Sequence, residues 1–372
     1  MRRDKRVKKK TSTTYKLAKQ LIPGGTQLFS KKPDLFAPGE WPGYYSKAKG
    51  VNIWDLDGNK YLDMSIMNVG ACILGYADKF VDKEVKKVIN KGVSSSINAV
   101  EEFELAKLLL KLHPWAGGAR FARGGGEAMS IAIRIARAHT KKDKILFSGY
   151  HGWNDWYLSS NIQSKKNLNK FLLSGLDPAG VPKELINSAI PFDDSDIKNL
   201  ERKIKKYKDK VAAIVIEPAR GNEVNKSYLK KLVKIADKNK SVLIFDEITS
   251  GFRMNNGGIH LKSKIYPDIA VFAKSMANGY AMSAIIGKRK IMGSASKTFI
   301  SSTNWTERIG PTAAISTITK CINHKVFNHN IDLGKRMKKL WKKIAHKHGL
   351  KIQISGIDTL PSFSFLHKDN QK

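Results

Sequence analysis

The chain has 372 residues, and 67 lysines and arginines against 32 aspartates and glutamates give it a formal net charge of +35. Hydrophobic residues make up 41% and charged residues 27% of the sequence, so disorder, collagen-like repetition and a disulfide scaffold are excluded. The two cysteines have no metal-ligand spacing, and no apolar run reaches the length of a signal peptide or a membrane span. We predict a cytoplasmic protein without a membrane segment or a metal site.

The basic excess favours binding to polyanions such as nucleic acid. However, the lysines are spread over nearly every predicted helix. In residues 196–210 they occupy the face opposite to an apolar stripe of Ile197, Leu200, Ile204 and Tyr207. No zinc-finger spacing, RNA-binding aromatic signature or leucine zipper is present. We therefore expect no nucleic-acid partner, and a polyanion-binding protein on an inactive enzyme scaffold is the alternative from another functional class.

The N-terminal part is predicted to begin with a basic tail and a short helix within the first 20 residues. The following residues, up to 45, are rich in Gly and Pro, which favours an extended segment. Asp57-Gly58 lies between two alternating runs, which predicts a hairpin. Amphipathic helices and apolar strands then alternate from Lys79 onward. Helices are expected at 79–90, 99–112, 127–139, 196–210, 226–239, 309–322 and 330–346, and strands at 119–123, 144–148, 211–218, 241–247, 268–274, 282–287, 351–355 and 360–366.

This alternation predicts an α/β fold with a mostly parallel central sheet between two layers of helices. In such a sheet, functional groups gather at the carboxyl ends of the strands. The first candidate is the Gly124–Gly126 turn between a strand and a helix. Its N–H groups and the helix dipole favour a phosphate, although this motif alone is better explained as a flexible strand-to-helix turn.

The second candidate segment places Tyr150, His151, Trp153 and Trp156 after a strand, where they favour stacking on a flat heterocycle or packing in the core.

The remaining candidates are charged residues at two strand ends. Asp246 and Glu247 end the strand 241–247, where a carboxylate requires solvent or a cationic partner. Lys274 ends the strand 268–274, and a desolvated lysine there can act as a carbonyl nucleophile. Together with the phosphate turn and the aromatic segment, these residues describe one ligand, pyridoxal 5'-phosphate. Its protonated ring accepts electrons, and its aldehyde forms a Schiff base with a lysine.

The ordered motifs GGGEAM, YHGW, IFDEITSGFR, AKSMANGYAMSAIIG and SSTNWTERIGPTAA resemble the class III aminotransferases, which are fold-type-I pyridoxal-phosphate enzymes. The nearest likeness is to members similar to glutamate-1-semialdehyde 2,1-aminomutase, and it extends from about Ile22 to the end of the chain. It implies an enzyme that moves an amino group from a small-molecule donor to a keto or aldehyde acceptor, in a homodimer with shared active sites. Glutamate 1-semialdehyde, a sugar and other keto compounds are all open as substrates.

The resemblance also implies roles for residues around the cofactor ring. Lys274 is the Schiff-base lysine and shuttles the proton between the substrate and the cofactor. Asp246 pairs with the pyridinium nitrogen, and Ile248 packs against the ring. Tyr150 stacks on the opposite face of the ring, with His151 beside it.

The phosphate is expected to bind to backbone N–H groups of Gly124, Gly125 and Gly126. Family members often carry hydroxyl residues in this loop, whereas glycines stand here, so the backbone supplies the donors. Ser302 and Thr303 are expected to reach the phosphate of the neighbouring subunit.

Three further expectations follow from the resemblance. Where aminomutases have an arginine for the substrate carboxylate, the nearest counterparts are Lys31 and Lys32, which offer no bidentate fork. Residues 1–50 are assigned to the small domain, 51–305 to the large cofactor-binding domain and 306–372 to the C-terminal part of the small domain. Family chains continue beyond this point, so we expect that C-terminal part to be incomplete.

Overall fold

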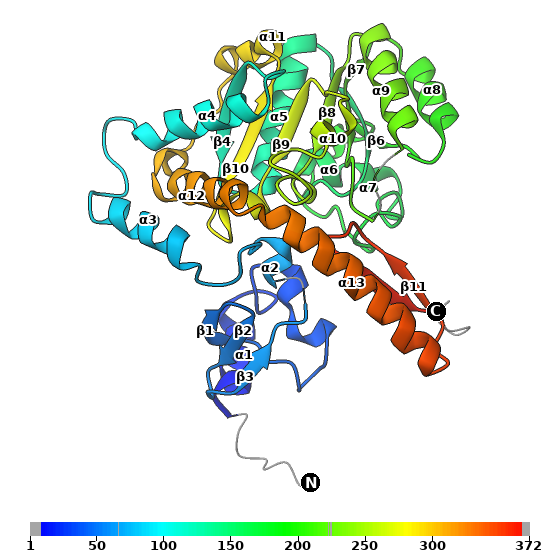
Figure 1. The fold of residues 1–372 in the computed structure, drawn as a ribbon. Helices are drawn as coiled ribbons and strands as arrows, with labels where there is room; N and C mark the ends of the chain where they lie inside the picture. The colour runs from blue at the N-terminus through cyan, green and yellow to red at the C-terminus, as the bar shows by residue number, and fades with distance from the viewer. Residues whose placement is uncertain (1–8, 66, 222, 224, 367–372) are drawn as a thin grey trace.

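A seven-stranded sheet forms the centre of the computed structural model, which describes residues 9–65, 67–221, 223 and 225–366 (Figure 1). The strand order is β4 (Gly118–Ala122), β10 (Ser283–Gly287), β9 (Ile269–Phe272), β8 (Val242–Asp246), β7 (Val211–Ile216), β5 (Lys144–Ser148) and β6 (Ala189–Pro191). β10 is antiparallel to both of its neighbours, and the other neighbouring strands are parallel. The predicted mostly parallel sheet is therefore confirmed.

Helices cover both faces of this sheet because its strands are apolar on both sides. Ile244 of β8 packs into the core under α5 (Gly125–Thr140), whereas Leu243 and Phe245 point into the core on the opposite face. That opposite face is covered by α3 (Lys79–Ile89), α4 (Val100–Leu112), α8 (Ile197–Lys206), α9 (Lys226–Lys238) and α12 (Ile309–Asn323). The strands predicted for this sheet lie within two residues of their predicted bounds, and only the short edge strand β6 was missed.

The N-terminal part forms a separate small layer below the sheet in Figure 1. It contains α1 (Lys9–Leu21), two short 3-10 turns and a three-stranded antiparallel sheet of β1 (Tyr45–Lys49), β2 (Asn52–Asp55) and β3 (Lys60–Leu62). The predicted hairpin is confirmed, since β2 pairs with β3 across the turn. The 3-10 turns at Phe29–Lys31 and Pro33–Leu35 replace part of the expected extended segment, and β1 was not predicted.

The C-terminal part consists of the long helix α13 (Val326–Lys347) and the hairpin of β11 (Ile352–Ser355) and β12 (Ser362–Phe365). α13 starts four residues before its predicted start at 330. The N–H of Gly356 donates to the carbonyl of Gly221 at 2.6 Å, which joins this part to the loop after β7. The division of the chain at residues 50 and 305 stays a prediction.

Short elements complete the described chain: α2 (Met67–Gly70), α6 (Asp155–Leu158), α7 (Ser160–Gln163), α10 (His260–Ser263), α11 (Arg289–Met292) and 3-10 turns at Lys183–Leu185, Lys274–Ala277, Gly293–Lys297 and Thr303–Thr306. Within this described part, no helix combines the length and the apolar character that crossing a membrane requires.

Candidate active site

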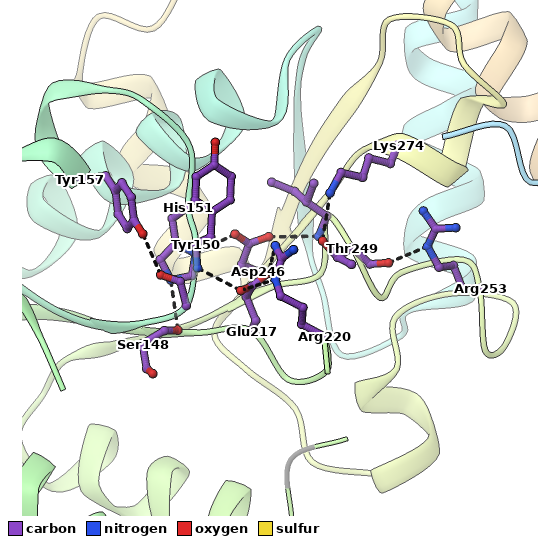
Figure 2. Close-up of polar contacts among 12 residues, drawn as sticks. Ser148, Tyr150, His151, Tyr157, Glu217, Arg220, Asp246, Thr249, Arg253 and Lys274 are labelled. Carbon is purple, nitrogen blue, oxygen red and sulfur yellow. Dashed lines mark hydrogen bonds and ion pairs between the residues drawn. The ribbon is translucent and has the colours of Figure 1, made fainter. Parts of the chain in front are cut away.

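The carboxyl ends of four neighbouring strands bring the candidate residues to one edge of the sheet (Figure 2). His151 follows β5, Glu217 follows β7, Asp246 ends β8, and Lys274 follows β9. These strands are adjacent and parallel in the sheet, so residues up to 123 positions apart in sequence (274 − 151) meet in one place. The structure therefore gathers the charged residues that the sequence predicted at strand ends.

Asp246 is buried and paired with His151. Its Oδ2 lies 2.7 Å from Nδ1 of His151, and its Oδ1 accepts the N–H of Ile248 at 3.0 Å. The other ring nitrogen of His151 lies 3.2 Å from the carbonyl oxygen of Ser148, and Trp156 stacks on the imidazole with ring centroids 6.1 Å apart. An ionised carboxylate has about four lone-pair sites, so Asp246 retains acceptor capacity for one more donor, such as a protonated ring nitrogen.

Lys274 presents an amine that no carboxylate contacts in the described part of the chain. Its Nζ donates a hydrogen bond to the hydroxyl of Thr249 at 3.0 Å. Desolvation, followed by repulsion from Arg220 and Arg253, lowers the pKa of Lys274 to about 8. Its backbone is also left-handed, with φ of 49°, which is uncommon for a residue with a side chain. About a tenth of this amine is therefore unprotonated, and nucleophilic, at pH 7.

The predicted phosphate turn forms the first turn of α5. The helix begins at Gly125, two residues before the predicted start at Glu127. The N–H of Gly124 donates to the carboxylate of Glu127 at 2.8 Å. By contrast, the N–H groups of Gly125 and Gly126 have no acceptor within the described residues. The N–H groups of Gly125 and Gly126 are therefore available to a phosphate, whereas that of Gly124 is used within the turn, and phosphate binding by these three glycines stays a prediction.

Side chains lie close to these glycines, so a larger residue at either position would require its neighbour to move. A Cβ atom on Gly126 would lie 2.7 Å from Oδ1 of Asn154, and one on Gly125 would lie 3.0 Å from Cδ1 of Ile248. A Cβ on Gly152 would lie 3.1 Å from Cα of Gly126, so the loop after β5 touches the start of α5. Oδ1 of Asn154 is buried and has no hydrogen-bond partner in the described structure. These contacts place Oδ1 of Asn154 beside Gly126 at the helix N-terminus.

These residues fit pyridoxal phosphate in three respects. The N-terminus of α5 at Gly125 and Gly126 offers N–H donors for the phosphate, and Asp246 offers an acceptor for the ring nitrogen. The amine of Lys274 lies at the same edge of the sheet for the aldehyde. Tyr150 is half-buried and lies over this edge, with its ring 5.9 Å from that of Tyr157. The roles of Tyr150, Ile248 and His151 toward the ring stay predictions.

Two residues of this site were missed in the sequence. Glu217 is 8% exposed and forms hydrogen bonds with Arg220, whose Nε lies 2.8 Å from each carboxylate oxygen. Glu217 also accepts the N–H of Tyr150 at 3.0 Å, and a Cβ on Gly149, which has φ of 121°, would lie 2.7 Å from Oε2 of Glu217. The available signal was the charged pair directly after the apolar strand at 211–216, the same pattern that indicated Asp246.

Glu247, next to Asp246, points to the opposite side of the sheet. Its Oε1 lies 2.5 Å from Nδ1 of His260, and its Oε2 accepts the N–H of Ile259 at 2.6 Å and the hydroxyl of Ser250 at 3.1 Å. Nε2 of His260 accepts the indole N–H of Trp115 at 2.9 Å, which places the histidine proton on Nδ1. Burial acts to raise the pKa of Glu247, but His260 and the backbone N–H groups hold it below its usual value.

Other predicted residues lie outside this cluster. Ser302 and Thr303 are exposed and bind none of the residues above within the described chain, so their reach into a neighbouring subunit stays a prediction. Lys31 is exposed and Lys32 half-buried, and neither forms an ion pair or hydrogen bond with a site residue in the part of the chain described here.

Comparisons with known proteins agree with this geometry. The chain is 32% identical over 364 residues to a 3-aminobutyryl-CoA aminotransferase of Cloacimonas acidaminovorans, covering 96% of this chain and 83% of the relative. It is 35% identical over 294 residues to a glutamate-1-semialdehyde 2,1-aminomutase of Wigglesworthia glossinidia brevipalpis, covering 77% of this chain and 66% of the relative. The structure matches an omega-transaminase from Sphaerobacter thermophilus with a TM-score of 0.83 and 26% identity, covering 96% of this chain and 83% of the other.

The family model described as Aminotransferase class-III matches residues 36–372. The predicted resemblance, the fold-type-I architecture and the predicted cofactor are thereby confirmed. The chain belongs to the class III aminotransferases, and its cofactor is pyridoxal 5'-phosphate.

Proposed function

We propose that this enzyme transfers an amino group from a small-molecule donor to a separate keto or aldehyde acceptor, with Lys274 as the lysine that holds the cofactor and moves the proton. The observation that carries the proposal is the amine of Lys274, bonded to a hydroxyl instead of a carboxylate and placed at the same sheet edge as the Asp246–His151 pair. An ion pair would keep that amine protonated, whereas the Thr249 hydroxyl holds it without fixing its charge.

Pyridoxal phosphate, when bound, supplies a protonated ring that withdraws electrons from the substrate carbon. The residues of the chain supply the rest. Nζ of Lys274, with its pKa lowered to about 8, takes a proton from the substrate carbon and returns it near neutral pH. Thr249 orients Nζ through its hydroxyl. Asp246, held by His151, provides the negative charge that keeps the ring nitrogen protonated.

We further propose a homodimer in which Ser302 and Thr303 complete the phosphate site of the partner. Both residues are exposed, and two large aromatic side chains are exposed as well: Phe299, three residues before Ser302, is 83% exposed, and Trp153, beside Gly126, is 70% exposed. Large exposed aromatic side chains are typical of surfaces that become covered by a partner.

Internal transfer, as in an aminomutase, is the second candidate function. It is supported by the likeness to glutamate-1-semialdehyde 2,1-aminomutases, one of which, from Methanocaldococcus jannaschii, is 30% identical over 97% of this chain. Transfer between separate molecules is supported by the 3-aminobutyryl-CoA aminotransferase, which matches over 96% of the chain.

The test is a parallel assay of the cofactor-loaded protein. We expect amino product from a panel of amine donors with keto and sugar acceptors, and little or no 5-aminolevulinate from glutamate 1-semialdehyde. Lys274→Ala should abolish transfer and the visible absorption of the bound cofactor, whereas Lys234→Ala, on the exposed face of α9, should retain both. Full transfer by Lys274→Ala would contradict the assigned lysine, and efficient 5-aminolevulinate formation would establish the aminomutase instead.

A further inference from the structure

The guanidinium of Arg220 is restrained on one edge and on one face. On its edge, Nε lies 2.8 Å from both oxygens of Glu217, and Nη2 lies 2.5 Å from Oε1. On its face, the guanidinium lies 5.9 Å from the ring centroid of Tyr150. Glu217 is itself fixed by the N–H of Tyr150. A side chain held in this way has lost most of its rotamer freedom before any ligand arrives, which favours tight binding.

The opposite edge of the guanidinium is available. Arginine carries five N–H donors, and Glu217 takes those of Nε and one of Nη2. No acceptor binds Nη1 within the described residues. Nη1 and the second N–H of Nη2 therefore form an end-on fork, whose spacing matches the two oxygens of a carboxylate. The side chain is 27% exposed and is therefore partly open to solvent.

The fork lies close to the reactive amine. Arg220 is the strongest of the charges that act on Lys274, and Asp246 and Tyr150 are among the groups that act on Arg220. Figure 2 shows the guanidinium beside Asp246, in the same cluster as Glu217 and Thr249. A substrate with its amine at Lys274 is thus within reach of a cation that Glu217 has already oriented.

We propose that Arg220 binds a carboxylate of the amino donor or of its keto acceptor, and thereby determines specificity for carboxylate-bearing substrates. The inference rests on the proposed function, because it places the substrate's amine at Lys274. Glu217 is the positioning residue for Arg220. If Arg220 only supported Tyr150, replacing Arg220 would lower kcat/KM equally for all substrates.

The first arm of the test compares donors that differ only in a carboxylate. Alanine is paired with isopropylamine, and 3-aminobutanoate with 2-aminobutane, since each amine has a methyl group where the acid has its carboxylate. Arg220→Lys keeps a positive charge on Glu217, so the fold is preserved, but it removes the fork. We expect the ratio of kcat/KM for acid over amine to fall about 30-fold, with the values for the amines changed less than threefold.

The second arm measures binding without turnover. Butanoate and butanamide are titrated into the cofactor-loaded protein by calorimetry, and we expect butanoate to bind more tightly to the wild type and to lose this preference in Arg220→Lys. The matched control is Arg202→Lys, at an exposed arginine of α8 that lies 3.4 Å from Asp196. It should change neither the acid-over-amine ratio of kcat/KM nor the preference for butanoate.

Three outcomes would overturn the inference. Arg220→Lys could lower kcat/KM equally for acids and amines, or it could change neither kcat/KM nor butanoate binding. The wild type could also bind butanoate no more tightly than butanamide. If the wild type transfers no amino group, but binds butanoate through Arg220, the proposed function fails while carboxylate binding by Arg220 stands.

Discussion

Two carboxylate–histidine pairs lie on opposite sides of the end of β8, and they differ in how many donors each carboxylate has. Asp246 faces the site and accepts from His151 and one backbone N–H. Glu247 faces the core and accepts from His260, from two backbone N–H groups and from Ser250. The first carboxylate therefore retains capacity for a ligand, whereas the second is saturated by the protein. We therefore expect Asp246 to serve the chemistry and Glu247, its neighbour in sequence, to serve the stability of the fold.

The largest expected effect comes from Asp246→Asn. The variant keeps the shape of the side chain but removes the negative charge that stabilises a protonated ring nitrogen, so we expect transfer to slow about 1000-fold, or about 4 kcal/mol in the barrier. The thermal midpoint should change by only a few degrees. Steady-state kinetics on the loaded protein check this, with exposed Asp237→Asn as control. Activity near that of the wild type would contradict the pairing of Asp246 with the ring nitrogen.

Glu247→Gln should act on stability instead. Without its charge, His260 and the buried N–H groups lose a strong acceptor, and we expect the free energy of unfolding to fall by about 3 kcal/mol. Urea denaturation measures this, and kcat of the folded protein should stay within about threefold of wild type. Because the pKa of Glu247 is lowered by folding, its stabilising contribution is present above the ordinary value of 4.5 and is lost on acidification through the lower folded value. A large loss of kcat without loss of stability would show that Glu247 serves the chemistry and not the stability of the fold.

Lys274→Met tests the same comparison at a residue of the site. Burial of the Lys274 amine should lower the free energy of unfolding. The pKa of this lysine falls from 10.5 to about 8 on folding. The loss of stability from burying the protonated amine is therefore complete below about pH 8 and disappears above pH 10.5. We expect the cofactor-free variant to be more stable than wild type by about 2 kcal/mol at pH 7. Thermal unfolding at pH 7 and pH 10.5 tests this, and a variant less stable at pH 7 would contradict the desolvation of the amine.

The smallest effect is expected from Gly126→Ala. Alanine favours the helix, so the fold should be retained, but its Cβ would lie 2.7 Å from Oδ1 of Asn154 and crowd the N–H groups proposed for the phosphate. We expect the dissociation constant for pyridoxal phosphate to rise about tenfold, or about 1.4 kcal/mol, by fluorescence titration. Gly293→Ala has open space around its Cβ and serves as control. An unchanged affinity would place the phosphate elsewhere.

The sequence predicted the sheet and the residues at its strand ends because long apolar strands bury both faces and leave their polar residues at the tips. The strand pattern alone did not separate Asp246 from Glu247, since both end the same strand and only the tertiary fold decides which side each faces; the family resemblance singled out Asp246. The Glu217–Arg220 pair was missed for a related reason. Arg220 looks like one surface cation among many until the structure places Glu217 and Tyr150 against it. The start of α5 was misplaced because glycine is a poor helix former, and here tertiary contacts override that preference.

The buried guanidinium of Arg253 links the site to a distant segment of the chain. Its Nε donates to the carbonyl of Thr249 at 2.6 Å, and its Nη2 donates to the carbonyl of Gly70, 183 residues away in sequence. Thr249 is the residue that holds the amine of Lys274. Through Arg253 and Thr249, the segment at Gly70 therefore helps to hold the loop that orients the reactive amine, although within the described residues it forms no hydrogen bond with the amine or with the other charged residues of the site.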